Sequence, residues 1–85
     1  MADLKVGRVI HYYDKIGVAI IELSATLSVG DKIKFVRGGE DMFEQDVESI
    51  QIEHQNVPEA KPGDSIGIKV KDRVRDHDIV YKVLP

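Results

Sequence analysis

The chain has 85 residues, which is enough for one domain and too few for two. Its 12 Lys and Arg and 15 Asp and Glu give a net charge of −3, which argues against a protein that coats nucleic acid by non-specific phosphate contacts. The absence of cysteine excludes disulfides and thiolate metal sites, and no apolar run is long enough for a signal peptide or a membrane span. We therefore expect one cytoplasmic domain over residues 1–85.

Six segments are rich in β-branched and aromatic residues and predict strands. They are Leu4–Tyr13, Val18–Leu23, Lys32–Arg37, Met42–His54, Ser65–Val70 and Ile79–Val83. Loops are predicted over Asn56–Gly63, which holds two prolines, and over the polar segment Lys71–Asp78. The acidic segment Asp41–Glu53 also has some helical spacing, but its β-branched residues and the lack of an N-cap box favour a strand.

The long fourth strand changes parity along its length. Phe43 and Val47 occupy odd positions, whereas Ile50 and Ile52 occupy even ones. If all four side chains face the core, one extra residue must be absorbed near residues 48–49. A bulge or corner at this point would bend the sheet.

Glycine pairs and Gly-Asp pairs mark the predicted turns. Gly38-Gly39 lies between two apolar runs and predicts a tight hairpin. Gly30-Asp31 and Gly63-Asp64 each precede an alternating strand, where the aspartate can bond the backbone two residues further on. We interpret both Gly-Asp pairs as structural turns and not as paired catalytic carboxylates.

These elements predict an all-β fold. Six short strands with turns between them favour a small closed or nearly closed six-stranded antiparallel β-barrel, because closure removes the exposed edges of the sheet.

Four motifs, in this order, resemble a known type of barrel. They are Val6-Gly7-Arg8-Val9, Leu27-Ser28-Val29-Gly30-Asp31-Lys32-Ile33, Val47-Glu48-Ser49-Ile50 and Ala60-Lys61-Pro62-Gly63-Asp64-Ser65-Ile66-Gly67-Ile68. The set resembles domain 2 of the translational GTPases such as elongation factor Tu, and stand-alone translation elongation factor-like proteins. The ending Val74–Val83 is similar to the C-terminal barrel of collagenase-like peptidases.

The resemblance implies a fold more than a function. The chain has no Gly-x-x-x-x-Gly-Lys-Ser/Thr loop, so neither nucleotide binding nor GTPase activity is expected. In the translation factors this barrel helps to hold transfer RNA, but no contacting residue can be matched to a position in this chain.

No catalytic constellation or cofactor motif is found, so we expect a protein that is not an enzyme. Asp76, His77 and Asp78 are potential metal ligands. Adjacent residues of an extended segment point to opposite sides, which leaves at most Asp76 and Asp78 on one face. We interpret this segment as a solvated loop and expect no metal site.

A basic stripe is predicted along one extended face, with two more lysines on a neighbouring strand. It consists of Lys69, Lys71, Arg73 and Arg75, extended by Lys32 and Lys34. Such a stripe can contact RNA phosphates, with Tyr12, Tyr13 or Phe43 as stacking residues. The same residues also fit an ordinary charged outer face that discourages edge pairing.

Two classes of partner follow from these patterns. The leading interpretation is a binding module that associates with RNA or the ribosome through the basic stripe. The alternative is a protein–protein adaptor, such as an accessory domain of a peptidase-like enzyme, with an apolar patch built from Met42, Phe43 and Val57-Pro58. Self-pairing through an open edge strand is a third option, and the oligomeric state is not predicted.

Overall fold

The structure, a computed structural model, describes residues 3–84 and contains ten strands and no helix over that range. The strands are β1 (Asp3–Tyr13), β2 (Val18–Leu23), β3 (Leu27–Ser28), β4 (Lys32–Arg37), β5 (Glu40–Asp46), β6 (Ile50–Ile52), β7 (Gln55–Val57), β8 (Glu59–Ala60), β9 (Ser65–Lys69) and β10 (Ile79–Val83). Over residues 3–84, then, no helix is long and apolar enough to cross a membrane.

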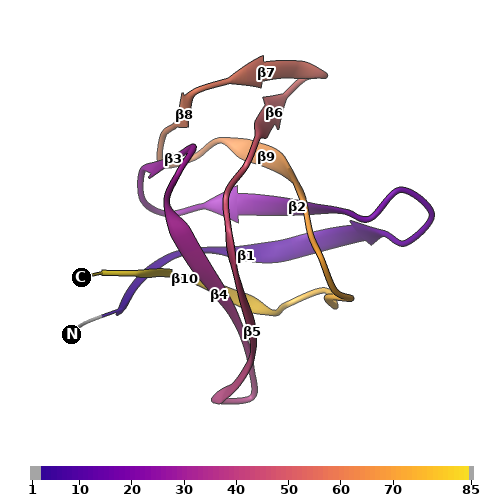
Figure 1. The fold of residues 1–85 in the computed structure, drawn as a ribbon, viewed down its shortest axis with the longest axis vertical. Helices are drawn as coiled ribbons and strands as arrows, with labels where there is room; N and C mark the ends of the chain where they lie inside the picture. The colour runs from indigo at the N-terminus through magenta and orange to yellow at the C-terminus, as the bar shows by residue number, and fades with distance from the viewer. Residues whose placement is uncertain (1–2, 85) are drawn as a thin grey trace.

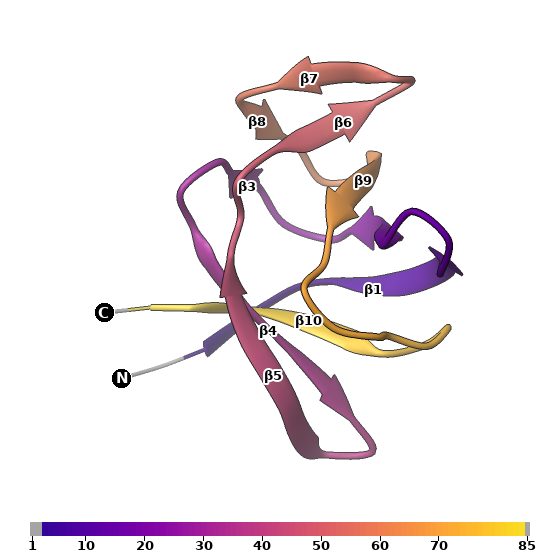
Figure 2. The same ribbon diagram turned by 45° about the vertical axis from the view of Figure 1, so that its right-hand side comes forward.

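Eight strands form one strongly curved sheet in the order β5-β4-β10-β1-β2-β9-β6-β7, and β3 pairs with β8 in a second, small sheet. All pairings are antiparallel. Figures 1 and 2 show the large sheet curling around the space between β1, β4 and β9. The predicted all-β antiparallel fold is therefore confirmed.

The closed six-stranded barrel is not confirmed. In the described part of the chain, β5 and β7 are the two edges of the large sheet and do not pair with each other. The count is also higher. β7 and β8 lie largely in the predicted loop Asn56–Gly63, β3 lies where no strand was predicted, and the predicted strand Met42–His54 is divided into β5 and β6. Long-range pairing, which local sequence does not reveal, stabilises these short strands.

The division between β5 and β6 is the predicted corner. The chain leaves strand geometry at residues 47–49 and resumes it at Ile50. Val47 and Ile50 are both buried, with exposed fractions of 1% and 0%. The irregular residues 47–49 therefore account for the change of parity at the predicted position. They lead the chain from β5, at one edge of the large sheet, to β6 near the other edge.

Two tight hairpins have different turn chemistry. Between β4 and β5, Gly38 and Gly39 have φ of 60° and 81°, as a type I′ turn requires. Between β6 and β7, Glu53 and His54 have φ of 50° and 64° without any glycine. This second hairpin carries no turn signal in the sequence, so the segment after it was wrongly predicted as a loop.

The two Gly-Asp turns are structural, as predicted, but the aspartates bond backward and not forward. Asp31 Oδ2 accepts a hydrogen bond from the Ser28 N–H at 2.8 Å, and Asp64 Oδ2 accepts one from the Lys61 N–H at 2.9 Å. Each carboxylate therefore stabilises, by this hydrogen bond, the turn that precedes its strand.

One continuous core fills the inside of the curved sheet. It includes Val6, Val9, Ile21, Leu27, Ile33, Phe35, Val47, Ile50, Ile66, Ile68, Val74 and Val80, all at most 3% exposed. Burial of this apolar surface is the main term that stabilises the fold. Gly7 on β1 lies so close to β2 that an added Cβ would be 2.5 Å from the Glu22 carbonyl oxygen.

The first and last described strands are neighbours. β1 pairs with β10 in antiparallel register, with Asp3 opposite Val83. The far end of β1 leads into the turn to β2, which projects away from these ends (Figure 1).

Candidate functional site

The basic stripe does not form one face. β9 ends at Lys69, and Lys71, Arg73 and Arg75 lie in the irregular segment that follows it. The side chains therefore do not alternate along an extended strand, although all four are exposed. Residues 71–75 lie in the predicted loop Lys71–Asp78, and the extended geometry that would align the four side chains ends at Lys69. Binding of nucleic acid by these residues stays a prediction.

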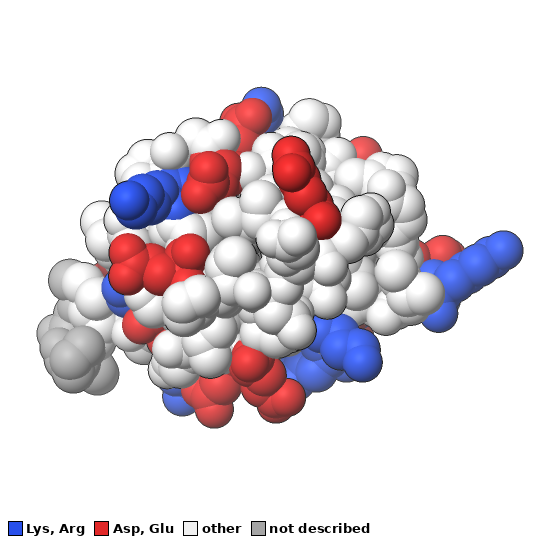
Figure 3. Space-filling model, turned by 90° about the horizontal axis from the view of Figure 1, so that it is seen from above, with Lys and Arg blue, Asp and Glu red and all other residues white. Residues whose placement is uncertain are grey.

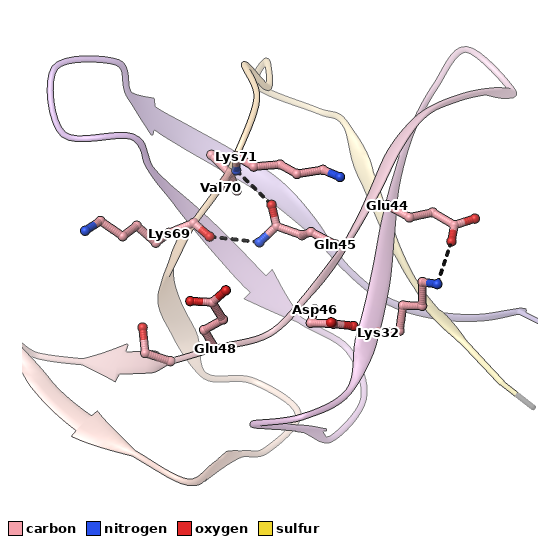
Figure 4. A pocket seen from close by; sticks show the side chains of 9 residues that line it. Lys32, Glu44, Gln45, Asp46, Glu48, Lys69, Val70 and Lys71 are labelled. Atoms are coloured by element: carbon pink, nitrogen blue, oxygen red, sulfur yellow. Dashed lines mark hydrogen bonds and ion pairs between the residues drawn. The ribbon is translucent and has the colours of Figure 1, made fainter.

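Lys32, Lys69 and Lys71 line a groove of about 710 Å³ between β5, the corner at residues 47–49 and residues 69–71 (Figure 4). We call it the seam groove. Its other lining residues are Glu44, Gln45, Asp46, Glu48, Ser49 and Val70. Three lysines thus face three carboxylates, and Lys32 pairs with Glu44 at 3.5 Å. The seam groove is not a basic surface.

Gln45 crosses the seam groove and joins its two walls (Figure 4). Its Nε2 donates a hydrogen bond to the Lys69 carbonyl at 2.8 Å, and its Oε1 accepts one from the Lys71 N–H at 2.9 Å. This role has no signal in the sequence, because a single half-buried glutamine in a strand has no distinctive pattern.

Lys34, two positions after Lys32 on β4, lines neither the seam groove nor the second pocket described below. It pairs with Asp3 and with Asp41, and its Nζ is 6.0 Å from the centre of the Tyr81 ring. The hydrogen bond to Asp3, opposed by partial burial and aided by Asp41, raises the pKa of Lys34. A lysine with two acidic partners is poorly available for a phosphate.

Arg73 and Arg75 line a second pocket, of about 490 Å³, which we call the end pocket. Its lining residues are Tyr12, Asp14, Arg37, Met42, Phe43, Asp72, Arg73, Val74 and Arg75. They come from three separate places: the end of β1 with its turn, the β4–β5 hairpin and the segment between β9 and β10. This pocket brings together two predicted stacking residues, half of the predicted apolar patch and two members of the basic stripe.

The end pocket has an apolar floor. The Phe43 ring stacks on Phe35 of the core, with ring centres 4.8 Å apart, and Tyr12 also packs against the core. Val74 is 3% exposed, whereas Met42 on the rim is 42% exposed. The floor is thus held by the core beneath it.

An ion pair between Arg37 and Asp78 fixes the rear of the end pocket. Arg37 Nε and Nη2 donate to the two Asp78 carboxylate oxygens, both at 2.8 Å, and the Arg75 N–H donates to Asp78 Oδ2 at 2.9 Å. Burial alone would raise the pKa of Asp78, but the bonds from Arg37 and the Arg75 backbone outweigh it and lower the pKa. The same contact raises the pKa of Arg37.

The ion pair involves Asp78, one of the three potential metal ligands named from the sequence. Asp78 is 2% exposed and bound to Arg37, so it is not available as a ligand. Within residues 3–84 no group of three His, Asp or Glu side chains is placed to hold a metal ion.

The predicted apolar patch does not form as one surface. Met42 and Phe43 lie on β5 near its hairpin with β4, whereas Val57 ends β7. Figure 1 places β7 and the β4–β5 hairpin turn at opposite ends of the molecule. Tyr13 is 48% exposed and packs edge-on against His11, outside the end pocket.

Charges of both signs are mixed on the face seen from the β7 end (Figure 3). Separate Lys and Arg side chains lie there among Asp, Glu and a larger uncharged surface, and the described residues show no continuous basic area in this view. Such a surface provides little long-range attraction for a polyanion.

Most of the chain is similar in sequence to part of two proteins named as a protease and a collagenase. The chain is 40% identical over 78 residues to an uncharacterized protease of Methanocaldococcus jannaschii and 38% identical over 78 residues to a collagenase of Porphyromonas gingivalis. These matches cover 92% and 91% of this chain but only 19% and 22% of the relatives. The chain therefore spans about a fifth of the length of the relatives it matches.

The same fold occurs in a solved structure. The C-terminal domain of a Geobacillus thermoleovorans protein described as a U32 peptidase superposes with a TM-score of 0.87, covering 95% of this chain and 93% of that one. At 23% identity the likeness shows a shared fold. No protein-family model matches the sequence.

The translation-factor resemblance has narrower support. Elongation factor 1-alpha of Methanosarcina barkeri is 40% identical over 48 residues, which is 56% of this chain and 11% of that protein. The resemblance to collagenase-like peptidases is therefore the better supported of the two.

Proposed function

We propose that residues 1–85 are a non-catalytic accessory domain of the collagenase-like peptidase type, and that the domain acts by binding protein. The observation that carries the proposal is that almost the whole chain aligns with only a small part of two peptidases. The same fold also occurs as a C-terminal domain. A unit of this kind adds binding to an enzyme whose chemistry resides elsewhere.

The polar groups of the chain support a binding role. Asp78, the acidic side chain that is buried within residues 3–84, is already neutralised by Arg37, whereas a general acid or base must be free to exchange a proton. The end pocket instead combines the apolar side chains of Met42, Phe43 and Val74 with charged groups, so it can contact both the apolar and the polar parts of a peptide.

We further propose that Gln45 makes this sheet a nearly closed barrel. Its two hydrogen bonds connect β5 with residues 69–71 where backbone pairing is missing. The accessory domain would then present the end pocket on a rigid support.

A chimeric enzyme tests the accessory role. In the P. gingivalis collagenase, the 78 matching residues are deleted or replaced by this chain, and hydrolysis of gelatin and of a short fluorogenic peptide is measured. We expect the deletion to reduce kcat/KM for gelatin at least tenfold (about 1.4 kcal/mol) and to spare the short peptide, and this chain to restore gelatin hydrolysis.

Two outcomes would contradict the proposal. A chimera no better than the deletion would show that this chain does not have the accessory role. Hydrolysis of either substrate by the isolated 85-residue chain would show that the domain is itself catalytic.

A second candidate is association with RNA or the ribosome, favoured by the partial match to elongation factor 1-alpha. Retention of RNA by the tagged chain at low salt, with loss at high salt and in Lys69→Glu/Arg73→Glu, would support it, because phosphate contacts weaken steeply with salt. Protein retained at high salt without RNA would support the accessory role.

A further inference from the structure

We infer that the end pocket binds a proline-rich polypeptide segment in the polyproline II conformation; this inference rests on the proposed function and names its ligand. The pocket volume of about 490 Å³ lies in the usual range for ligand sites. Its floor contains Tyr12 and Phe43, and aromatic-lined grooves are the surfaces on which proline rings pack in known polyproline II recognition.

The rim supplies the hydrogen-bonding groups that such a ligand needs. A polyproline II segment has no internal hydrogen bonds, so its carbonyl oxygens are free, and proline has no N–H to donate. The partner must therefore supply donors. Over residues 3–84 neither the Arg73 nor the Arg75 guanidinium has an acidic group within 4.0 Å, so both can donate to ligand carbonyls.

The charge of the site selects a neutral ligand. The three guanidinium groups of the end pocket are balanced by Asp14 and Asp72 on the rim and by Asp78 behind Arg37. A site without net charge gives no general attraction to an RNA backbone or to an acidic peptide. A proline-rich segment without ionisable side chains carries acceptors but no charge, and it fits both properties.

Site and ligand are both ordered before they meet. The Arg37–Asp78 pair and the Arg75 N–H fix the segment that carries Arg73, and the stack on Phe35 fixes Phe43. Polyproline II is a preformed, extended conformation. Association therefore loses little conformational entropy, which favours binding from a modest contact area.

Fluorescence anisotropy with a labelled (Pro-Pro-Gly)n peptide, too short to form a triple helix, tests the inference on the full 85-residue chain. We expect the wild-type chain to bind and Met42→Ala/Arg73→Ala to raise Kd about tenfold or more, because a charge-assisted hydrogen bond and an apolar contact are lost. The matched control is Lys69→Ala/Lys71→Ala in the seam groove, for which we expect less than a twofold change (about 0.4 kcal/mol). Circular dichroism confirms that each variant is folded.

Any of four results would overturn the inference: no binding by the wild-type chain, equal binding of a Gly-Ser peptide of the same length, equal weakening by both double variants, or displacement of the peptide by a uridine-rich RNA oligonucleotide. The peptide assay contains no peptidase, so its failure is distinguishable from failure of the accessory role. Lack of peptide binding with an active chimera would overturn the ligand alone, and peptide binding with an inactive chimera would overturn the accessory role alone.

Discussion

The side-chain carboxamide of Gln45 takes the place of a peptide group beside Val70. It donates to the carbonyl of the residue before Val70 and accepts from the N–H of the residue after it. A residue in a parallel strand makes this same pair of bonds to its neighbour. One side chain thus completes the hydrogen bonding where the sheet has no strand pairing.

Replacing Gln45 tests how much this bridge contributes. Gln45→Ala is expected to lower the free energy of unfolding by about 1–2 kcal/mol, since two hydrogen bonds are lost. It should also increase the hydrogen-exchange rate of the Lys71 amide. Gln51→Ala, which removes one exposed bond to Asn56, is the matched control and should have a smaller effect. Equal effects of the two substitutions would contradict the bridging role.

Breaking the Arg37–Asp78 ion pair is expected to lower the free energy of unfolding by more than loss of the Gln45 hydrogen bonds does. Asp78→Ala leaves Arg37 without its partner and the Arg75 N–H without its acceptor, and we expect a loss of about 3 kcal/mol in chemical denaturation. Arg37 is partly exposed, so water can solvate it and keep the loss at the lower end of the range for buried pairs. Asp76→Ala, at an exposed neighbour, should change stability by less than about 0.5 kcal/mol.

The same pair predicts a dependence on pH. The pKa of Asp78 is lower in the folded chain than in the unfolded chain, where it is about 3.9. The stabilisation by ionised Asp78 is therefore fully present above about pH 4 and is lost as the pH falls through the folded pKa. The difference in unfolding free energy between wild type and Asp78→Asn should shrink below about pH 4. If the difference in unfolding free energy between the two proteins stays constant down to low pH, ionised Asp78 is not the source of the stabilisation.

Gly7 is predicted to be intolerant of any side chain. In Gly7→Ala the new methyl group would lie 2.5 Å from the Glu22 carbonyl oxygen and 2.9 Å from Ile21 Cγ2. Separating β1 from β2 to relieve this overlap should cost about 1–3 kcal/mol, seen as a lower Tm. In Gly67→Ala the nearest atom, Val18 Cγ1, is 3.4 Å away, so a much smaller effect is expected.

The β6–β7 turn offers a stabilising change. Glu53 and His54 have positive φ, which is unfavourable for residues with a Cβ. Glu53→Asn/His54→Gly introduces the preferred type I′ pair and should raise the free energy of unfolding by about 1–2 kcal/mol. Glu53→Ala/His54→Ala should give no such gain, and a gain there would show that backbone strain is not the cause.

The sequence revealed the strands whose signals are local. The β-branched and aromatic residues of Lys32–Arg37 predicted β4, the two glycines predicted its hairpin, and the change of parity after Val47 predicted the corner. Each of these features depends on residues close together in the chain, where periodicity and turn chemistry are readable.

The site depended on contacts between distant residues and was found only in part. Arg37 and Asp78 are 41 positions apart, and Gln45 lies 24 positions from Lys69, so neither contact leaves a local pattern. The alternation of charge from Lys69 to Arg75 predicted one extended face, but strand pairing ends at Lys69 and residues 71–75 lie in the predicted loop. Sequence named Tyr12, Phe43, Met42 and Arg73 separately, and the fold brought them into one pocket.

The pairing of Asp3 with Val83 has a consequence for how this fold can be joined to others. Both ends of the described chain lie on the same side of the fold. The domain could therefore be inserted into a surface loop of another protein with both junctions close together. The end pocket is built at the opposite end of β1, together with the β4–β5 hairpin. A graft made through the paired ends would therefore leave the pocket facing away from its host, open to a ligand.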